Sequence, residues 1–292
     1  LCGGRSLSML LQRVITALVL LAILLPALFY PDPGPFTLVV LALMAAGAWE
    51  WGRLNGFGQA AALGLGALCV GLCGLSWAAG GLQSSMSWAW AAGGGLWVLG
   101  GAGLLRAGVV GWPQIPKALR VAGGLLALWL AWLAVVQARM LGVNFLLSVL
   151  SLVWVADIGA YFAGRAFGQR FTRNKLAPSI SPGKSWEGVW GGMAGVLLLA
   201  LLWVWADQAL QPAVPSFYTR LARQGWWLLL LGAIFMAAMS VVGDLVESLV
   251  KRSAGAKDSS SLLPGHGGVL DRVDALLPTL PLAMMLSSWV YG

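Results

Sequence analysis

Two pairs of acids, at the ends of one polar segment, are the side chains of this sequence best suited to chemistry. Asp244 and Glu247 lie three residues apart, and Asp271 and Asp274 repeat that spacing. Residues three or four apart share a helix face, so each pair can project in one direction. All-oxygen sets suit Mg²⁺, which proteins usually hold with one or two carboxylates plus substrate phosphates and water. We predict that these four acids bind the metal, with a place behind the other three as the alternative for Glu247. The alternative for the whole set is salt bridging, for example from Asp271 to Lys251.

The segment between the two pairs is basic and broken by glycine. It contains KDSSSLLPGHGG, in which Pro-Gly and Gly-Gly interrupt helices. His266 is the only histidine, so a zinc site is not expected. A Ser-His triad is not expected either, because it would not need the acid clusters. The side chain of His266 could touch a phosphate, or it could be a structural hydrogen-bond donor. We place Lys251 and Arg272 with Asp244, Asp271 and Asp274 as catalytic, and expect substrate binding by Ser248, Arg252, Lys257, Asp258, His266, Gly267 and Gly268.

Asp157 lies in the middle of an apolar run, SLVWVADIGAYFAGRAFG. A charge at the centre of a membrane helix costs at least about 2.5–3.5 kcal/mol on insertion scales. One interpretation is a carboxylate paired with an arginine to hold helices together. We favour the other, in which Asp157 faces a polar cavity and contributes to substrate binding.

The loop that follows, RFTRNKLAPSISPGKSWEG, combines cations, hydroxyls and glycines. Ammonium groups, hydroxyls and backbone N–H groups at a helix start can hold phosphates. Ser185 is placed to cap the helix that leads into the next apolar segment. An ordinary basic loop beside a membrane remains the alternative. The candidate substrate-binding residues here are Lys175, Ser181, Lys184, Ser185 and Glu187.

The elements that must position these residues are membrane helices. The chain is 59% hydrophobic and only 10% charged, whereas soluble domains carry about 25% charged residues. About 20 apolar residues cross a bilayer as a helix. We therefore expect an all-α, polytopic integral membrane protein with about nine spans, at residues 14–30, 36–51, 60–79, 88–105, 119–138, 145–164, 188–206, 226–246 and 275–291.

The cations predict how these spans are oriented. With nine spans and a cytoplasmic N-terminus, 15 of the 18 Lys and Arg fall on the cytoplasmic side, and only Arg139, Arg220 and Arg223 fall on the other. This is the bias of the positive-inside rule. We therefore expect the long polar loops, and the active site, to face the cytoplasm. Nucleic acid is an unexpected partner, because the cations sit in short loops beside the spans, where anionic lipid head groups and phosphates are the expected partners.

The acids divide the chain into two parts. Seven of the ten Asp and Glu lie beside the motifs of the C-terminal half. We interpret residues 1–140 as an N-terminal transmembrane scaffold, to which we assign no site residue, and residues 141–292 as a C-terminal catalytic transmembrane module.

The polar segment also resembles a known family. Between Ser248 and Asp274 the fixed positions follow S-x-x-K-R-x4-K-D-x4-L-P-x-H-G-G-x-x-D-R-x-D, which is similar to the signature of the phosphatidate cytidylyltransferases, or CDP-diacylglycerol synthases. DIGAYFAGRAFG and KLAPSISPGKSWEG resemble two further motifs of this family. Gly183 is a departure, because many relatives carry lysine there. The resemblance is strong over roughly 145–292, whereas the N-terminal spans match only in kind.

The resemblance implies transfer of CMP from CTP to phosphatidic acid, giving CDP-diacylglycerol and pyrophosphate for phospholipid biosynthesis. It also implies a Mg²⁺-dependent enzyme of a bacterial-type inner membrane, a homodimer, and a second cation such as K⁺. Asp244, Asp271 and Asp274 match the family's metal-binding acids. Two other functions stay open: a transporter whose pathway uses Asp157, and the same chemistry on a different anionic lipid. No clear internal repeat, frequent in transporters, is present.

Overall fold

The computed structural model describes residues 3–291, and the side chains of residues 11–289. Within these residues the protein is a bundle of helices, and β-structure is limited to two isolated bridges. The helices are α1 (Gly3–Phe29), α2 (Gly34–Leu54), α3 (Gln59–Ala78), α4 (Ser87–Gly111), η1 (Trp112–Gln114), α5 (Lys117–Leu141), α6 (Val143–Phe167), α7 (Trp186–Leu210), α8 (Phe217–Gln224), α9 (Trp226–Ser253), α10 (Leu270–Val273) and α11 (Leu276–Tyr291).

The expected all-α membrane architecture is confirmed. Eight helices of the described part are long and apolar enough to cross a membrane: α1 to α7, and α9. Each coincides with one of the apolar segments of the sequence. The ninth segment forms α11, which has 16 residues and contains Pro281. At 1.5 Å per residue it is about 24 Å long, and its interior residues, such as Leu282, are buried among other helices.

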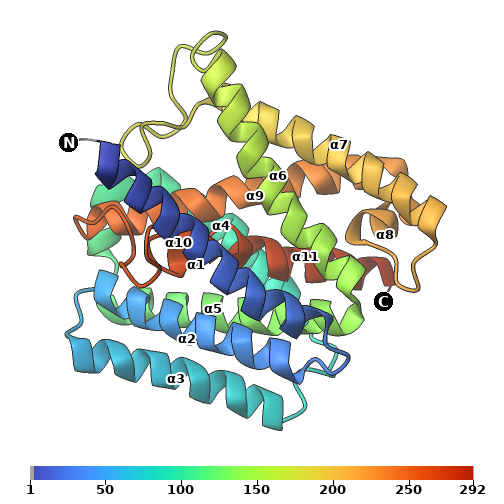
Figure 1. Cartoon of the computed structure of the whole chain (residues 1–292), viewed down its shortest axis with the longest axis horizontal. Coiled ribbons are helices and arrows are strands. Elements are labelled where there is room, and N and C mark those ends of the chain that lie inside the picture. The colour runs from blue at the N-terminus through green and yellow to red at the C-terminus, as the bar shows by residue number, and fades with distance from the viewer. Residues whose placement is uncertain (1–2, 292) are drawn as a thin grey trace.

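The long helices run back and forth between two ends of the molecule (Figure 1). The loops after α2, α4, α6 and α9 lie at the same end as the start of α1, and the loops after α1, α3, α5 and α7 lie at the opposite end. The assignment of 15 of the 18 Lys and Arg to one side of the membrane depends on this alternation. Arg139, one of the three cations of the far end, donates to the backbone oxygens of Leu28 (2.6 Å) and Tyr30 (2.7 Å).

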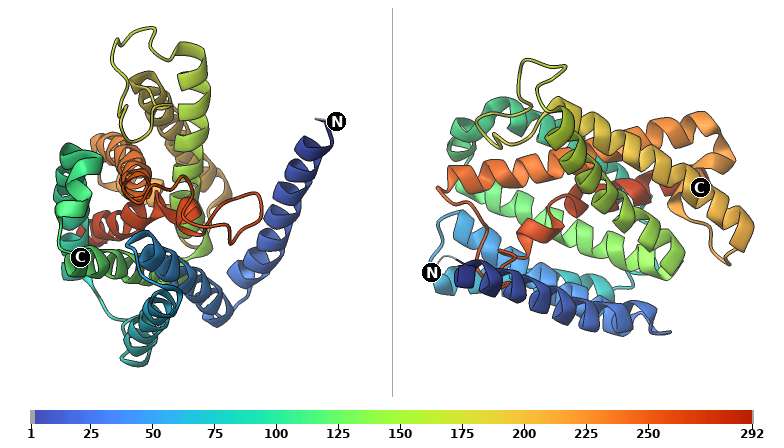
Figure 2. Two further views of the ribbon diagram at one scale, coloured as in Figure 1. Left: turned by 90° about the vertical axis from the view of Figure 1, so that its left-hand side faces the viewer. Right: turned by 45° about the horizontal axis from the view of Figure 1, so that its top comes forward.

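The core lies around α5, α9 and α11. Trp132 of α5 and Met236 of α9 are fully buried. By contrast, α1 packs mainly on α2 and leans away from the rest of the bundle (Figure 2). Its outer surface is covered with exposed leucine, isoleucine and valine side chains, as a helix bathed in hydrocarbon requires.

Small residues bring α6 and α7 into close contact, and this contact positions Asp157. A side chain at Gly191 would collide with Ala163 at 2.1 Å, and one at Gly192 would meet the backbone oxygen of Ala156 at 2.7 Å. Close backbone approach through glycine is typical of membrane helices. This contact fixes the path of α6 against α7. Asp157 follows Ala156, which is part of the contact.

Candidate active site

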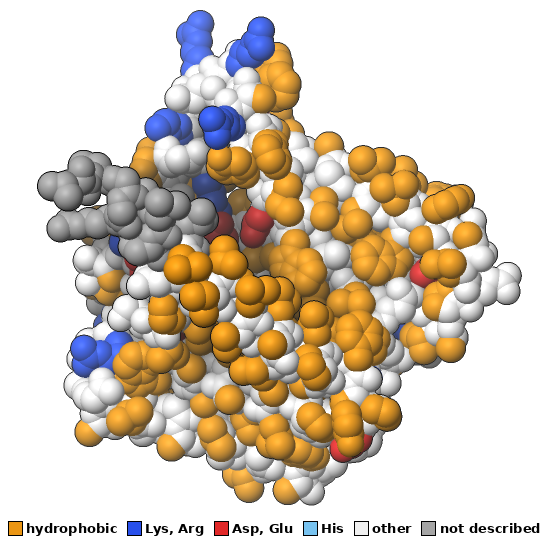
Figure 3. Space-filling view, in the orientation of Figure 1, with side chains coloured by type: hydrophobic (Ala, Val, Ile, Leu, Met, Phe, Trp, Pro, Cys, Tyr) orange, Lys and Arg blue, Asp and Glu red, His pale blue; other side chains and the backbone are white. Residues whose placement is uncertain are grey.

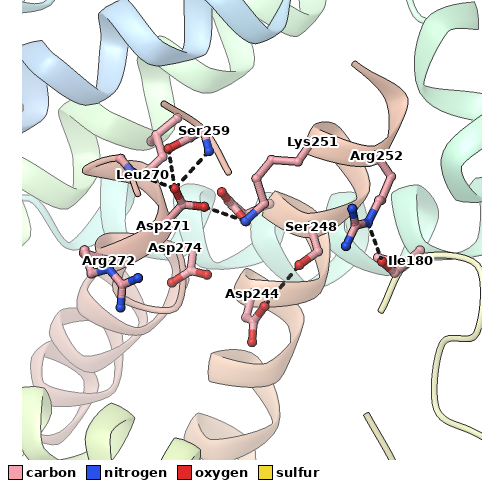
Figure 4. A network of polar contacts seen from close by, with 12 residues as sticks. Ile180, Asp244, Ser248, Lys251, Arg252, Ser259, Leu270, Asp271, Arg272 and Asp274 are labelled. Atoms are coloured by element: carbon pink, nitrogen blue, oxygen red, sulfur yellow. Dashed lines mark hydrogen bonds and ion pairs between the residues drawn. The ribbon is translucent and has the colours of Figure 1, made fainter. Parts of the chain in front are cut away.

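The end of α9 presents four polar side chains at helical spacing. Asp244, Glu247, Ser248 and Lys251 all occur within two turns. Lys251 Nζ lies 2.6 Å from Glu247 and 2.5 Å from Asp271 Oδ1. Ser248 donates to Asp244 at 3.3 Å. Figure 4 shows Asp244, Asp271 and Asp274 projecting into the space between α9 and the start of α10.

Asp271, in the first turn of α10, is held by several donors. Its Oδ2 accepts hydrogen bonds from Gly268 N (2.7 Å), Ser259 N (2.9 Å) and Ser259 Oγ (2.8 Å). Burial opposes ionisation of this carboxyl, but Lys251 and these N–H donors outweigh it and lower the pKa of Asp271 below its ordinary value. The salt bridge from Asp271 to Lys251 that the sequence allowed as an alternative is therefore present.

Asp274 is in the opposite electrostatic situation. Burial, and then the charge of Asp244, raise the pKa of Asp274 to about 7. Its Oδ1 accepts a hydrogen bond from Ala275 N at 2.8 Å. The charged form of Asp274 is therefore disfavoured, whereas that of the neighbouring Asp271 is stabilised.

The loop between α6 and α7 adds a cation to this cluster. Lys184 forms an ion pair with Asp244. Asp157 of α6 is exposed and lies within electrostatic range of Asp244 and Lys184. Figure 3 shows acidic and basic side chains inside a hollow that hydrophobic side chains surround, between α1 and α6. Asp157 is therefore close enough to feel both charges, and its place in a substrate cavity stays a prediction.

Glu187 and Ser185 organise that loop. Glu187 Oε1 accepts from Phe171 N (3.0 Å), Thr172 N (2.7 Å) and Thr172 Oγ1 (2.9 Å). Ser185 Oγ accepts from Gly188 N at 3.2 Å, which confirms the predicted helix cap. Both side chains therefore hold the loop in shape, and in this structure Glu187 contacts the loop rather than the carboxylate cluster.

The loop between α9 and α10 depends on its two consecutive glycines. Gly267 has φ +80°, a conformation that glycine adopts without steric cost. A Cβ at Gly268 would lie 2.0 Å from Ser259 Oγ and 2.4 Å from Glu50 Oε1. Gly268 therefore serves by its lack of a side chain, which lets two polar groups approach the backbone N–H that binds Asp271.

His266 has a structural role through its backbone. Its carbonyl oxygen accepts from Arg272 Nε (2.9 Å) and Nη2 (2.6 Å), so Arg272 is tied to the loop. The Nδ1 atom of His266 is buried and has no hydrogen-bond partner among the described residues.

The remaining predicted residues lie on the two loops. Lys175, Lys257 and Asp258 are exposed there. Ser181 is bridged to Ala177, and Arg252 donates to Ile180 O at 3.4 Å, joining α9 to the α6–α7 loop.

Glu50 of α2 is the residue that sequence reasoning missed. It is fully buried and accepts from Ser260 Oγ (2.6 Å), Ser259 Oγ (3.1 Å) and the backbone N–H groups of Val269 (2.9 Å) and Leu270 (2.8 Å). It thus anchors the α9–α10 loop where α10 begins. The available signal was an acid within the apolar run AWEWGRL, one residue before the end of the predicted span at 36–51.

Known proteins resemble this chain over nearly its whole length. The cytidylyltransferase family matches residues 11–290. This chain belongs to the cytidylyltransferase family. Phosphatidate cytidylyltransferase of Pseudomonas aeruginosa is 41% identical over 297 residues, covering 97% of this chain and 98% of that protein. The enzyme of that name from Haemophilus influenzae is 35% identical over 305 residues, covering 94% and 96%. That of Brucella suis is 42% identical over 147 residues, or 50% of this chain and 48% of that protein. The family expected from the polar segment is confirmed.

In this member of the cytidylyltransferase family, the described carboxylates carry the negative charge that a divalent cation needs, but they are not already arranged around a metal position. In the described part, no three Asp, Glu, His or Cys side chains lie close enough together to hold a metal ion. Two lysines, Lys184 and Lys251, face five acids: Asp157, Asp244, Glu247, Asp271 and Asp274. Because Mg²⁺ needs only one or two protein carboxylates when phosphates supply other ligands, the donor set fits that ion.

Proposed function

We propose that this protein transfers CMP from CTP to phosphatidic acid, giving CDP-diacylglycerol and pyrophosphate. The observation that carries the proposal is the cluster of acids and lysines around Asp244 and Asp271, which lies at one end of an apolar helix bundle. A polar site with an apolar surround suits a substrate whose head group reacts while its acyl chains stay in the bilayer. Two relatives that match nearly the full chain carry the name of this activity.

The reaction requires charge compensation more than a base. A phosphate oxygen of phosphatidate, ionised at neutral pH, attacks the α-phosphorus of CTP, and the bond to the bridging oxygen of the β-phosphate breaks to release pyrophosphate. Lys184 and Lys251 are placed to offset the repulsion between the two polyanions, and Arg272 and Arg252 lie close by. Positioned charges of this kind are the main source of rate enhancement in phosphoryl-type transfer.

A Mg²⁺ ion is part of this proposal. Asp244 and Asp274 would hold it, with Asp271 fixed by Lys251 beside them and Glu247 behind that lysine. When bound, it would supply positive charge to the phosphates of CTP. A second cation such as K⁺ belongs to the same expectation, since five acids face two lysines. If the metal took the place of a lysine beside the acids, that lysine would be free to contact a phosphate.

The remaining expectations concern the setting of the enzyme. We infer a bacterial-type inner membrane, with the end that carries the loops after α6 and α9 in the cytoplasm, where CTP is available. The excess of Lys and Arg at that end supports this orientation. Homodimer formation is retained as an expectation of the family resemblance.

A direct assay tests the function. Purified protein with CTP, phosphatidic acid and Mg²⁺ should release pyrophosphate and form CDP-diacylglycerol. The same assay with UTP, or without lipid, gives the background. No product under conditions in which a known phosphatidate cytidylyltransferase is active would refute the proposal. Lipid analogues compared at fixed CTP distinguish phosphatidic acid from other anionic lipids, and flux into sealed vesicles without CTP would indicate a transporter.

Asp271→Asn tests the assignment of the central carboxylate. The amide is similar in shape but removes the charge that faces Lys251, so turnover should fall by about 10²-fold or more; the protein should still fold, with a lower thermal unfolding midpoint because the partly buried Lys251 loses a partner. Asp32→Asn, on an exposed acid at the other end of the bundle, is the matched control. Full activity of Asp271→Asn would remove Asp271 from the site.

A further inference from the structure

A second cavity lies against the adjoining face of α9. It has a volume of about 670 Å³ and is walled mainly by α4, α5 and α9. The wall is apolar, and α4 contributes small residues at helical spacing, including Gly93, Gly100 and Ala107. We call this cavity the α4–α5 groove. It lies on a different face of α9 from Asp244 and Lys251, because Gly243 and Val250 line the groove, and Glu247 lies between the two faces, since it lines the groove and contacts Lys251.

The groove opens to the outside of the bundle at the depth of the membrane. Leu96 and Leu119 line it and are 58% and 63% exposed. In a bilayer, the medium at this opening is hydrocarbon. Water has few polar partners on such a wall and does not fill apolar cavities, so the molecule available to occupy the groove is an acyl chain.

Polar groups at one end of the groove indicate which lipid would be selected. Arg120 lines the groove one turn into α5, and its Nε is buried with no hydrogen-bond partner. Its guanidinium lies 5.7 Å from the ring centre of Trp112. An acyl chain gains little by leaving hydrocarbon for an apolar groove. The charge of Arg120 therefore has to supply the selectivity, and it favours an anionic phosphate.

Glu247 adds a second requirement. It lines the same groove and is only 6% exposed; its Oε2 contacts Lys251, and its Oε1 has no partner. Arg120 and Glu247 both belong to the helix turns near the end of the bundle that carries the α9–α10 loop. A buried carboxylate oxygen without a donor is costly, and a hydroxyl group on the lipid head group would satisfy it.

We propose that the α4–α5 groove binds an anionic glycerophospholipid whose head group carries a free hydroxyl. One acyl chain lies along Gly93, Gly100 and Ala107, the phosphate contacts Arg120, and the hydroxyl donates to Glu247 Oε1. Phosphatidylglycerol is such a lipid, and it is neither substrate nor product of the proposed reaction. Its binding can therefore be measured without turnover.

Thermal unfolding of delipidated protein in detergent tests the proposal. Phosphatidylglycerol should raise the unfolding midpoint of the parent by about 3 °C or more, because a ligand that binds only the folded state stabilises it. Phosphatidylcholine with the same acyl chains should do so much less. Gly100→Leu, whose new side chain enters open space in the groove, should abolish the effect of phosphatidylglycerol. Gly95→Leu on the same helix also enters open space but lies outside the groove, so it should respond as the parent does.

Two more variants keep the test decisive. Gly123→Leu fills the groove from α5 and replaces Gly100→Leu if that protein does not fold. Arg120→Gln should remove the preference for phosphatidylglycerol over phosphatidylcholine. An unchanged response of the groove-filling variants to phosphatidylglycerol, or an unchanged preference in Arg120→Gln, would overturn the proposal. Because no nucleotide is added, these outcomes are independent of whether the chain transfers CMP.

Discussion

Glu50 and Asp271 are two acids whose main contacts are with the loop that joins α9 to α10. Each carboxylate accepts several hydrogen bonds from that loop, and Ser259 donates to both. The spacing of Asp271 in the motif marked it as functional, but that spacing could not distinguish a metal ligand from a lysine partner. Its geometry here combines a salt bridge with an N-terminal helix position, where negative charge is stabilised.

Glu50→Gln should destabilise the protein and reduce activity together. The amide keeps one acceptor oxygen, but its NH₂ group would face two of the present donors, either Ser260 Oγ and Val269 N or Ser259 Oγ and Leu270 N. Leaving buried donors unpaired costs about 1–3 kcal/mol. Thermal unfolding and the pyrophosphate assay measure the two effects, with Asp32→Asn as control. Loss of activity without loss of stability would instead indicate that Glu50 touches substrate.

At the scale of elements, loops and helix ends decide where the polar groups meet. The α6–α7 loop delivers Lys184 to Asp244, and the α9–α10 loop delivers Gly268 and Ser259 to Asp271. The positions of the membrane helices could be predicted because apolar runs have membrane length, although α9 continues to Ser253, past the predicted end at 246. The loop paths could not, since Glu50 lies 219 residues from a partner in the loop that it holds, and the motif around Glu187 does not show which backbone groups that side chain binds.

Gly268→Ala should disrupt the α9–α10 loop. The added methyl group would lie within 2.4 Å of both Ser259 Oγ and Glu50 Oε1, so the loop has to move and Asp271 loses a donor. We expect activity to fall at least about tenfold, a change of about 1.4 kcal/mol in barrier. Gly183→Ala, where a methyl group meets nothing within 4 Å, is the control loop variant. Equal activity of the two variants would show that this loop tolerates the shift.

Asp207→Asn probes the opposite end of the bundle. Asp207 of α7 accepts from Thr219 Oγ1 (2.6 Å), Ser216 N (2.8 Å) and Asn144 Nδ2 (2.9 Å), and so joins α6, α7 and the start of α8. Its loss should lower stability by about 1–3 kcal/mol without changing KM for CTP. The measurements are thermal unfolding and steady-state kinetics. A raised KM would contradict the separation of this network from the active site.

For the whole molecule, the distribution of charge between the two ends sets the expected orientation. Ser85 and Arg173 are exposed at opposite ends of the bundle. In a chain from which the native cysteines have been removed, a membrane-impermeant maleimide applied to intact spheroplasts should label Ser85→Cys and not Arg173→Cys. Both should react after lysis. Labelling of Arg173→Cys in intact spheroplasts would reverse the proposed orientation.

The division of the chain at residue 140 stays a prediction. Glu50 belongs to the N-terminal part, yet it binds the loop of the C-terminal part. If the two parts are functional modules, they share at least this contact. A scaffold whose buried acid holds a catalytic loop would transmit changes in α2 directly to Asp271.

Local patterns in the sequence were enough to determine the helical membrane architecture, the family and most of the acids and lysines of the site. Hydrocarbon requires long apolar runs, and helical spacing places Asp244, Ser248 and Lys251 together. Tertiary structure alone decided that Lys184 reaches Asp244, that Glu50 anchors the α9–α10 loop, and that a groove forms between α4 and α5. These features depend on contacts between segments far apart in the chain, for which neither periodicity nor spacing carries a signal.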